Sequence, residues 1–247
     1  MLRFSLWTGL LLLGSAWAGP KDQLPGQRRA VLVELFTSEG CSSCPPADAL
    51  LEKLDRSQPI PGAEIVVLSE HVDYWNHIGW ADPYSSAVFS ARQEQYARRL
   101  HTQGPYTPQM VVDGRSEFVG SDMRAAEAAI RSALRLPKTG IDIGENGKAA
   151  AIEVSPLPTG TGHKAAVFAG FAADAGTQDV SRGENKGRRL HHVAILKELK
   201  QIGSIDDRSG LKTSLRVERG MRLIVFVQEL GNGWVWGAAM RPADARF

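Results

Sequence analysis

Short runs of branched and apolar residues recur along the first half of the chain and predict buried strands. A helical crossover would make the first two of these strands parallel, and a tight turn at Asp113-Gly114 would make the last two antiparallel. The predicted strands are residues 30–36, 64–68, 109–112 and 117–119.

Apolar residues at helical spacing lie between and after these strands. Helices are predicted over residues 47–54 and 84–100, the second with Val88 directed inward. Ser121 is expected to cap a third helix that ends near Leu134. The resulting order of elements predicts a mixed sheet flanked by helices.

The pattern changes after residues 136–140, which contain proline and glycine. Short apolar segments then alternate with turn signals such as Asn146-Gly147, and this spacing favours a mainly antiparallel, β-sandwich-like domain. The predicted strands are residues 141–154, 164–171, 193–199, 215–217, 223–227 and 234–238.

The first residues have the features of a secretory signal peptide. Arg3 precedes a short apolar run, and Ala16-Trp17-Ala18 supplies the small residues that signal peptidase recognises. The run is shorter than the roughly 20 residues that a membrane-spanning helix needs. We therefore expect a periplasmic or secreted protein. Its expected organisation is a signal peptide at 1–18, a flexible leader at 19–29, an α/β domain at 30–136 and a β-sandwich-like domain at 137–247.

The bulk composition narrows the class of partner. The 247 residues are 43% hydrophobic and 23% charged, which is ordinary for a globular chain that buries a core. A formal net charge of +2 gives no reason to expect nucleic acid or an anionic membrane surface as a partner.

Candidate chemistry is concentrated in the two cysteines, Cys41 and Cys44, because disulfides form and persist in exported proteins. A disulfide across so short a loop removes only about 2 kcal/mol of unfolded-state entropy, which is weak stabilisation for a chain of this size. At the start of a predicted helix, Cys41 lies near N–H groups that favour its thiolate, and Cys44 is placed to resolve a mixed disulfide. The spacing therefore predicts a redox-active dithiol with an accessible Cys41 sulfur.

The segments VLVELFTSEGCSSCPPAD and TPQMVVDG resemble the thioredoxin superfamily. CSSCPPAD, HVDYW and the later RGEN resemble most closely a poorly characterised secreted bacterial branch, a domain of unknown function, over nearly the whole mature chain. This resemblance implies a thioredoxin-like mixed sheet flanked by helices. It also implies thiol–disulfide oxidoreductase activity on protein or peptide thiols and disulfides, without a cofactor and with a redox partner protein. Ser42-Ser43 and Gly40 depart from the superfamily pattern around the dithiol, so the redox direction stays open.

The same resemblance assigns roles to three further residues. Pro108 would form a cis peptide bond after Thr107 beside the dithiol, so that the Thr107 backbone could pair with a substrate strand. Glu34 stands near the place of a buried aspartate that helps proton transfer to the resolving cysteine. A buried Glu34 would have a raised pKa and accept that proton, whereas a surface-facing Glu34 would not.

Four residues, His71, Asp73, Tyr74 and Trp75, follow the second predicted strand, at the edge where such sheets place ligands. They are candidates for lining a peptide groove, with His71 or Asp73 tuning the thiolate. The alternative is that the aromatic side chains cover the edge of the sheet.

Residues 181–192 (SRGENKGRRLHH) form a basic loop that is solvated, docks on the first domain or binds an anion. His191 and His192 alternate along a predicted strand, so they should face opposite sides and make a poor pair of metal ligands.

Two alternatives to an oxidoreductase stay open. The reduced dithiol would suit Cu(I), because soft thiolates select that ion, with His71 or His77 as a further ligand. The other alternative is a non-catalytic adaptor in which the β-sandwich-like domain binds a partner and the first domain is a scaffold.

Overall fold

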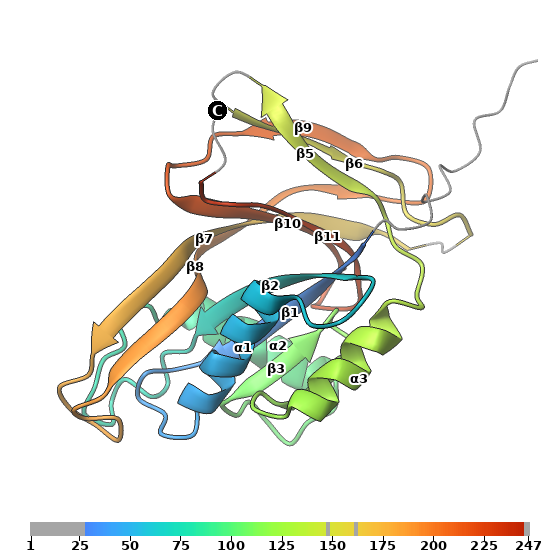
Figure 1. The fold of residues 1–247 in the computed structure, drawn as a ribbon. Helices are drawn as coiled ribbons and strands as arrows, with labels where there is room; N and C mark the ends of the chain where they lie inside the picture. The colour runs from blue at the N-terminus through green and yellow to red at the C-terminus, as the bar shows by residue number, and fades with distance from the viewer. Residues whose placement is uncertain (1–27, 147–148, 161–162, 245–247) are drawn as a thin grey trace, which may run out of the picture.

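A computed structural model describes residues 28–146, 149–160 and 163–244. The predicted signal peptide and most of the predicted leader lie outside the described residues. Within this part the chain is a mixed α/β protein, with a large, mainly β sheet and few helices (Figure 1). No helix in it is long and apolar enough to cross a membrane.

The large sheet has eight strands. In chain order they are β1 (Arg29–Thr37), β2 (Ala63–His71), β3 (Gln109–Val112), β4 (Ser116–Val119), β7 (Ala165–Asp179), β8 (Arg189–Ile205), β10 (Met221–Glu229) and β11 (Val235–Arg241). Their order across the sheet is β11-β10-β7-β8-β2-β1-β3-β4. As predicted, β1 and β2 are parallel and β3 and β4 are antiparallel.

Helices cover both faces of the first strands. α1 (Pro45–Ser57) and α3 (Met123–Ala133) pack on the face of β1 that carries Val33 and Leu35. α2 (Ala87–Arg99) packs on the opposite face, which carries Phe36. The alternation of side chains along β1 therefore decides which of its residues can approach α1.

Two predicted details of the helices are wrong. Val88 is 61% exposed, and Phe89 is buried in its place, because Ser86 caps α2 and sets which residues face the sheet. Asp122, rather than Ser121, caps α3, since its carboxylate accepts the N–H groups of the second and third helical residues.

A second, three-stranded sheet comes from the later part of the chain. It consists of β5 (Ile141–Asn146), β6 (Ala149–Val154) and β9 (Leu211–Leu215), in the order β5-β6-β9. Ile152 of this sheet shares one apolar core with Val167, Val225 and Trp236 of the large sheet.

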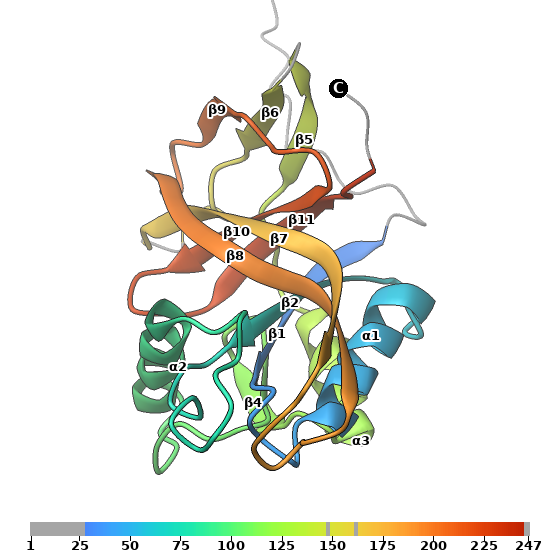
Figure 2. The same ribbon diagram turned by 90° about the vertical axis from the view of Figure 1, so that its left-hand side faces the viewer.

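The large sheet crosses the domain boundary predicted at residues 136/137. Ser69 of β2 pairs in parallel with Ile195 of β8, so the first and second halves of the chain share one sheet. β7 and β8 are also longer than the predicted segments and form a hairpin that reaches the loop before α1 (Figure 2). The sequence pattern missed the outer part of β7 because few of its residues are apolar and most are not buried.

Candidate functional site

The dithiol lies between the end of β1 and the start of α1. Cys41 and Cys44 form a disulfide, with their Cα atoms 5.4 Å apart. Cys44 directly precedes α1, and two prolines occupy the first helical positions, where a missing N–H costs no helical hydrogen bond. The N–H of Asp48 donates to the Cys44 carbonyl at 3.1 Å, so helical bonding begins at Cys44. The positive end of the helix therefore lies at the disulfide.

Both cysteine side chains are fully buried, which contradicts the accessible Cys41 sulfur expected from the sequence. The connection between β7 and β8 contacts the backbone of the dithiol loop beside them. The carboxylate of Glu184 accepts the N–H of Ser42 at 3.0 Å. The side-chain amide of Asn185 donates to the carbonyls of Glu39 and Cys41, at 2.9 Å each.

We call residues 180–188 the covering turn. Backbone hydrogen bonds close its base, and the Arg188 guanidinium donates to the Asn185 side-chain oxygen at 3.0 Å. Gly183, at φ 73°, lies against Trp80, because a Cβ placed on Gly183 would be 3.2 Å from the Trp80 Cβ. The structure thus places this basic loop on the dithiol loop. Docking on the first domain was one of the three interpretations of this loop from the sequence.

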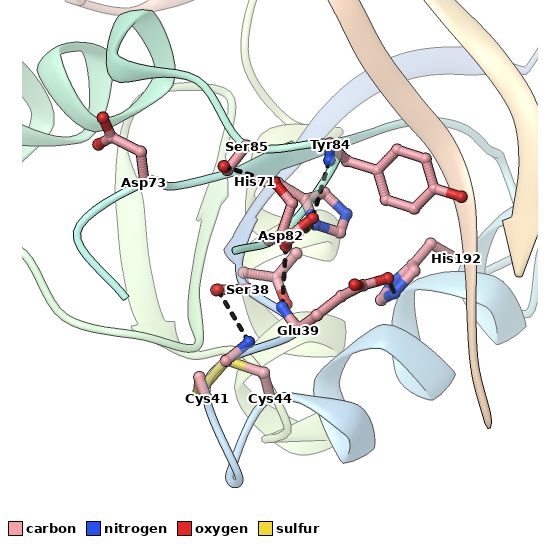
Figure 3. Close-up of polar contacts among 12 residues, drawn as sticks. Ser38, Glu39, Cys41, Cys44, His71, Asp73, Asp82, Tyr84, Ser85 and His192 are labelled. Carbon is pink, nitrogen blue, oxygen red and sulfur yellow. Dashed lines mark hydrogen bonds and ion pairs between the residues drawn. A yellow bond between two sulfur atoms is a disulfide. The ribbon is translucent and has the colours of Figure 1, made fainter. Parts of the chain in front are cut away.

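A buried charged cluster adjoins the dithiol loop (Figure 3). His192 of β8 lies between two carboxylates, with Nε2 3.4 Å from Glu39 Oε1 and Nδ1 3.5 Å from Asp48 Oδ1. Burial acts to lower the pKa of His192, but the two carboxylates outweigh it and raise that pKa to about 10. His192 is therefore a buried cation at neutral pH.

His71, at the end of β2, belongs to the same cluster. Its Nδ1 lies 2.7 Å from Asp82 Oδ2, and its ring meets the His192 ring edge to face with centroids 4.6 Å apart. Burial acts to raise the pKa of Asp82, but His71 and hydrogen bonds from the backbone of Glu39 and Tyr84 outweigh it and lower that pKa. His71 is fully buried, and Asp82 links it to the dithiol loop by accepting the N–H of Glu39. Its predicted contact with a substrate stays a prediction.

Trp75 connects the segment after β2 to the cis proline. Its indole N–H donates to the Thr107 hydroxyl at 2.8 Å, and the Thr107–Pro108 peptide bond is cis. A Cβ on Gly40 would lie 3.0 Å from the Trp75 Cβ, so Trp75 packs on the residue that precedes Cys41. Trp75, from the segment after β2, therefore lies beside the residue that precedes the dithiol.

Asp73 and Tyr74 contact α2. The Ser90 hydroxyl donates to Asp73 at 2.6 Å, and the Tyr74 hydroxyl donates to Gln93 at 3.0 Å. Burial raises the pKa of Tyr74 to about 12. These two side chains anchor the segment, and their predicted contact with a substrate stays a prediction.

Glu34 is buried on the α2 face of β1. Its carboxylate accepts from Arg92 Nε at 2.8 Å and from the Tyr96 hydroxyl at 2.5 Å. Since Val33 and Leu35 are the residues of β1 that point toward α1, the Glu34 carboxylate lies on the far side of the sheet from that helix. The geometry gives no support to Glu34 as the proton acceptor of the dithiol.

Sequence reasoning did not single out Asp48, Glu39 or His192 as functional residues. A signal existed for Asp48, which lies four residues after Cys44 and so shares its helical face. No local pattern indicates that His192 reaches that face, because the contact depends on how β8 joins the sheet.

Metal ligation has little geometric support. Among the described residues, no group of three or more histidine, cysteine, aspartate or glutamate side chains is arranged to hold a metal ion. Copper binding by the two thiolates alone stays a prediction.

Solved structures of other proteins have a fold similar to that of this chain. The structure of a protein from Agrobacterium tumefaciens matches with a TM-score of 0.75 and 26% identity, covering 90% of this chain and 98% of that one. HBP35 of Porphyromonas gingivalis matches with a TM-score of 0.56 and 13% identity, covering 90% and 79%, which is a likeness of fold alone. No curated protein matches the chain significantly.

The chain belongs to the DUF1223 family, described as a protein of unknown function, whose profile matches residues 32–228. The expected membership of a family of unknown function is confirmed.

Proposed function

We propose that this protein is an exported thiol–disulfide oxidoreductase with a thioredoxin-like core, acting on protein thiols and disulfides through Cys41 and Cys44. The observation that carries the proposal is the disulfide at the N-terminal end of α1. A helix N-terminus stabilises a thiolate, which makes the sulfur both an attacking and a leaving group. On this proposal, the C-terminal strands extend the core sheet and form a sandwich-like part with β5, β6 and β9.

In the exchange, the Cys41 thiolate attacks a partner disulfide, forms a mixed disulfide and releases the partner's first thiolate. Cys44 then loses its proton and attacks the Cys41 sulfur. The Cys41–Cys44 disulfide forms, the mixed disulfide breaks, and two electrons have passed to the partner. The reverse sequence oxidises a partner dithiol.

Asp48 takes the place that the sequence suggested for Glu34. It lies one helical turn after Cys44, on the α1 side of the sheet, and is 6% exposed. We therefore assign it the proton that Cys44 loses. The covering turn must also move during the exchange, because neither sulfur is exposed while Asn185 is bound.

The reduction potential of the dithiol, measured in glutathione buffers, tests the proposal together with exchange against DTNB, an aryl disulfide. We expect a potential within the range of about −120 to −270 mV found for disulfide oxidoreductases. Cys41→Ser should abolish exchange, and Cys44→Ser should stop it at the mixed disulfide. A potential below about −300 mV with no exchange would mark a structural disulfide and reject the proposal.

The full burial of both sulfur atoms favours one alternative, a non-catalytic adaptor in which the disulfide braces the start of α1. In that case the double variant Cys41→Ala/Cys44→Ala should fold and differ from the natural chain only in stability. The potential measurement separates the two functions.

A further inference from the structure

We propose that His192, supplied by the C-terminal half of the chain, is a positioning residue for the dithiol: it holds Asp48 beside Cys44 as an ionised proton acceptor. The inference rests on the proposed function and adds the β7–β8 hairpin to the active site.

The local geometry brings Asp48 to Cys44. Residues four apart on a helix are neighbours on one face, and the hydrogen bond from the Asp48 N–H to the Cys44 carbonyl shows that this turn is helical. The Thr37 hydroxyl donates to Asp48 Oδ1 at 2.9 Å, and His192 Nδ1 lies 3.5 Å from the same oxygen. Two side chains from other elements thus fix the position of this carboxylate.

The contacts of His192 are mainly electrostatic. Neither ring nitrogen has a hydrogen-bond partner within the described chain, and Glu39 Oε1 likewise accepts no hydrogen bond there, although all three atoms are buried. The other Glu39 oxygen accepts the indole N–H of Trp80 at 2.8 Å. Without the imidazolium, Asp48 and Glu39 would be buried carboxylates with no cation between them. A buried carboxylate that lacks a cation takes a proton more readily, because burial disfavours its charged form.

The groups that face His192 come from four places. Glu39 lies in the loop after β1, Asp48 in α1, His71 at the end of β2 and Tyr84 in the loop before α2. Burial and the charges of Glu39 and Asp82 raise the pKa of Tyr84, so its phenol is neutral. His71 is paired with Asp82, which leaves Glu39 and Asp48 as the carboxylates that His192 neutralises.

The step that depends on His192 is the deprotonation of Cys44. The Cys44 S–H bond breaks, its proton passes to the Asp48 carboxylate, and the sulfur keeps the electron pair. The new thiolate attacks Cys41 of the mixed disulfide and expels the partner thiolate. If His192 is absent and Asp48 is already protonated, Cys44 must lose its proton to solvent, which requires a higher pH.

The test follows the two phases of TNB release when reduced protein reacts with DTNB. The first phase reports attack by Cys41, and the second reports resolution by Cys44. In His192→Gln the second phase should slow by roughly 100-fold at pH 7, the low end of the range for general base catalysis, and recover as pH rises. His191→Gln is the matched control, because His191 is the exposed neighbour on the same strand.

An unchanged pH profile of the second phase in folded His192→Gln overturns the inference and leaves the proposed function intact. If the natural chain releases no TNB, the proposed function itself fails. If His192→Gln does not fold, the same comparison is made between Glu39→Gln and Glu39→Gln/His192→Gln, where one carboxylate fewer lowers the cost of losing the imidazole. An upward shift in pH is expected there as well, because Asp48 again lacks the cation beside it, and the absence of any shift overturns the inference.

Discussion

Removing the side chain of Asn185 should make the disulfide reducible by small thiols much faster. Asn185 is 1% exposed and donates to two backbone carbonyls of the dithiol loop. Each such bond contributes about 0.5–1.5 kcal/mol net, so the two together hold the covering turn closed by about 1–3 kcal/mol. In Asn185→Ala the open fraction should therefore rise by roughly 5- to 150-fold.

The assay is the initial rate of disulfide reduction by dithiothreitol, with samples quenched by iodoacetamide and the alkylated fraction measured by mass spectrometry. When opening is fast compared with reduction, the observed rate follows the open fraction. Lys186→Ala is the matched control, because Lys186 is an exposed residue of the same turn. Equal reduction rates for Asn185→Ala and the natural chain, with both folded, would refute the account of the covering turn.

Three further predictions concern stability. Arg92→Met should lower the free energy of unfolding by about 3–5 kcal/mol in urea titrations, because it leaves the carboxylates of Glu34 and Glu70 buried without their cation; a loss below about 1 kcal/mol would contradict this. Burial raises the pKa of Glu70 above its unfolded value, so this group's contribution to stability falls as pH rises from the usual range of a glutamate through the raised pKa. Glu70→Gln should weaken the loss of stability above about pH 5, and an unchanged pH dependence would argue against it. Gly120→Ala should lower stability by about 1–3 kcal/mol by thermal melting, since its Cβ would lie 2.7 Å from Leu35 Cδ1; an unchanged melting temperature would show that Leu35 moves aside.

The sequence was sufficient for the elements that local pattern determines. The predicted strand 30–36 agrees with β1 to within one residue at each end. The prediction succeeds because the run of branched apolar residues in this strand is buried on both faces. The placement of Cys44 before a helix that starts with two prolines was also predictable from the chemistry of first-turn amides.

Local pattern did not predict which face of the sheet a strand residue occupies. Alternation places Glu34 opposite Val33 and Leu35, but only the packing of α1 shows which of the two faces adjoins the dithiol. The same limit applies to His192. Its alternation with His191 predicts opposite faces, and the structure confirms this, but the partners on each face depend on contacts distant in sequence.

The position of β8 argues against treating residues 30–136 as an independent unit. β8 lies beside β2, so removing it would leave an apolar strand at an open sheet edge, which is a site for aggregation. The same removal would take away the Asn185 contact with the dithiol loop, and would leave Glu39 and Asp48 without His192 between them. The groups that enclose the dithiol and balance the charge beside it are therefore built from both halves of the chain, and the function proposed for Cys41 and Cys44 belongs to the whole fold.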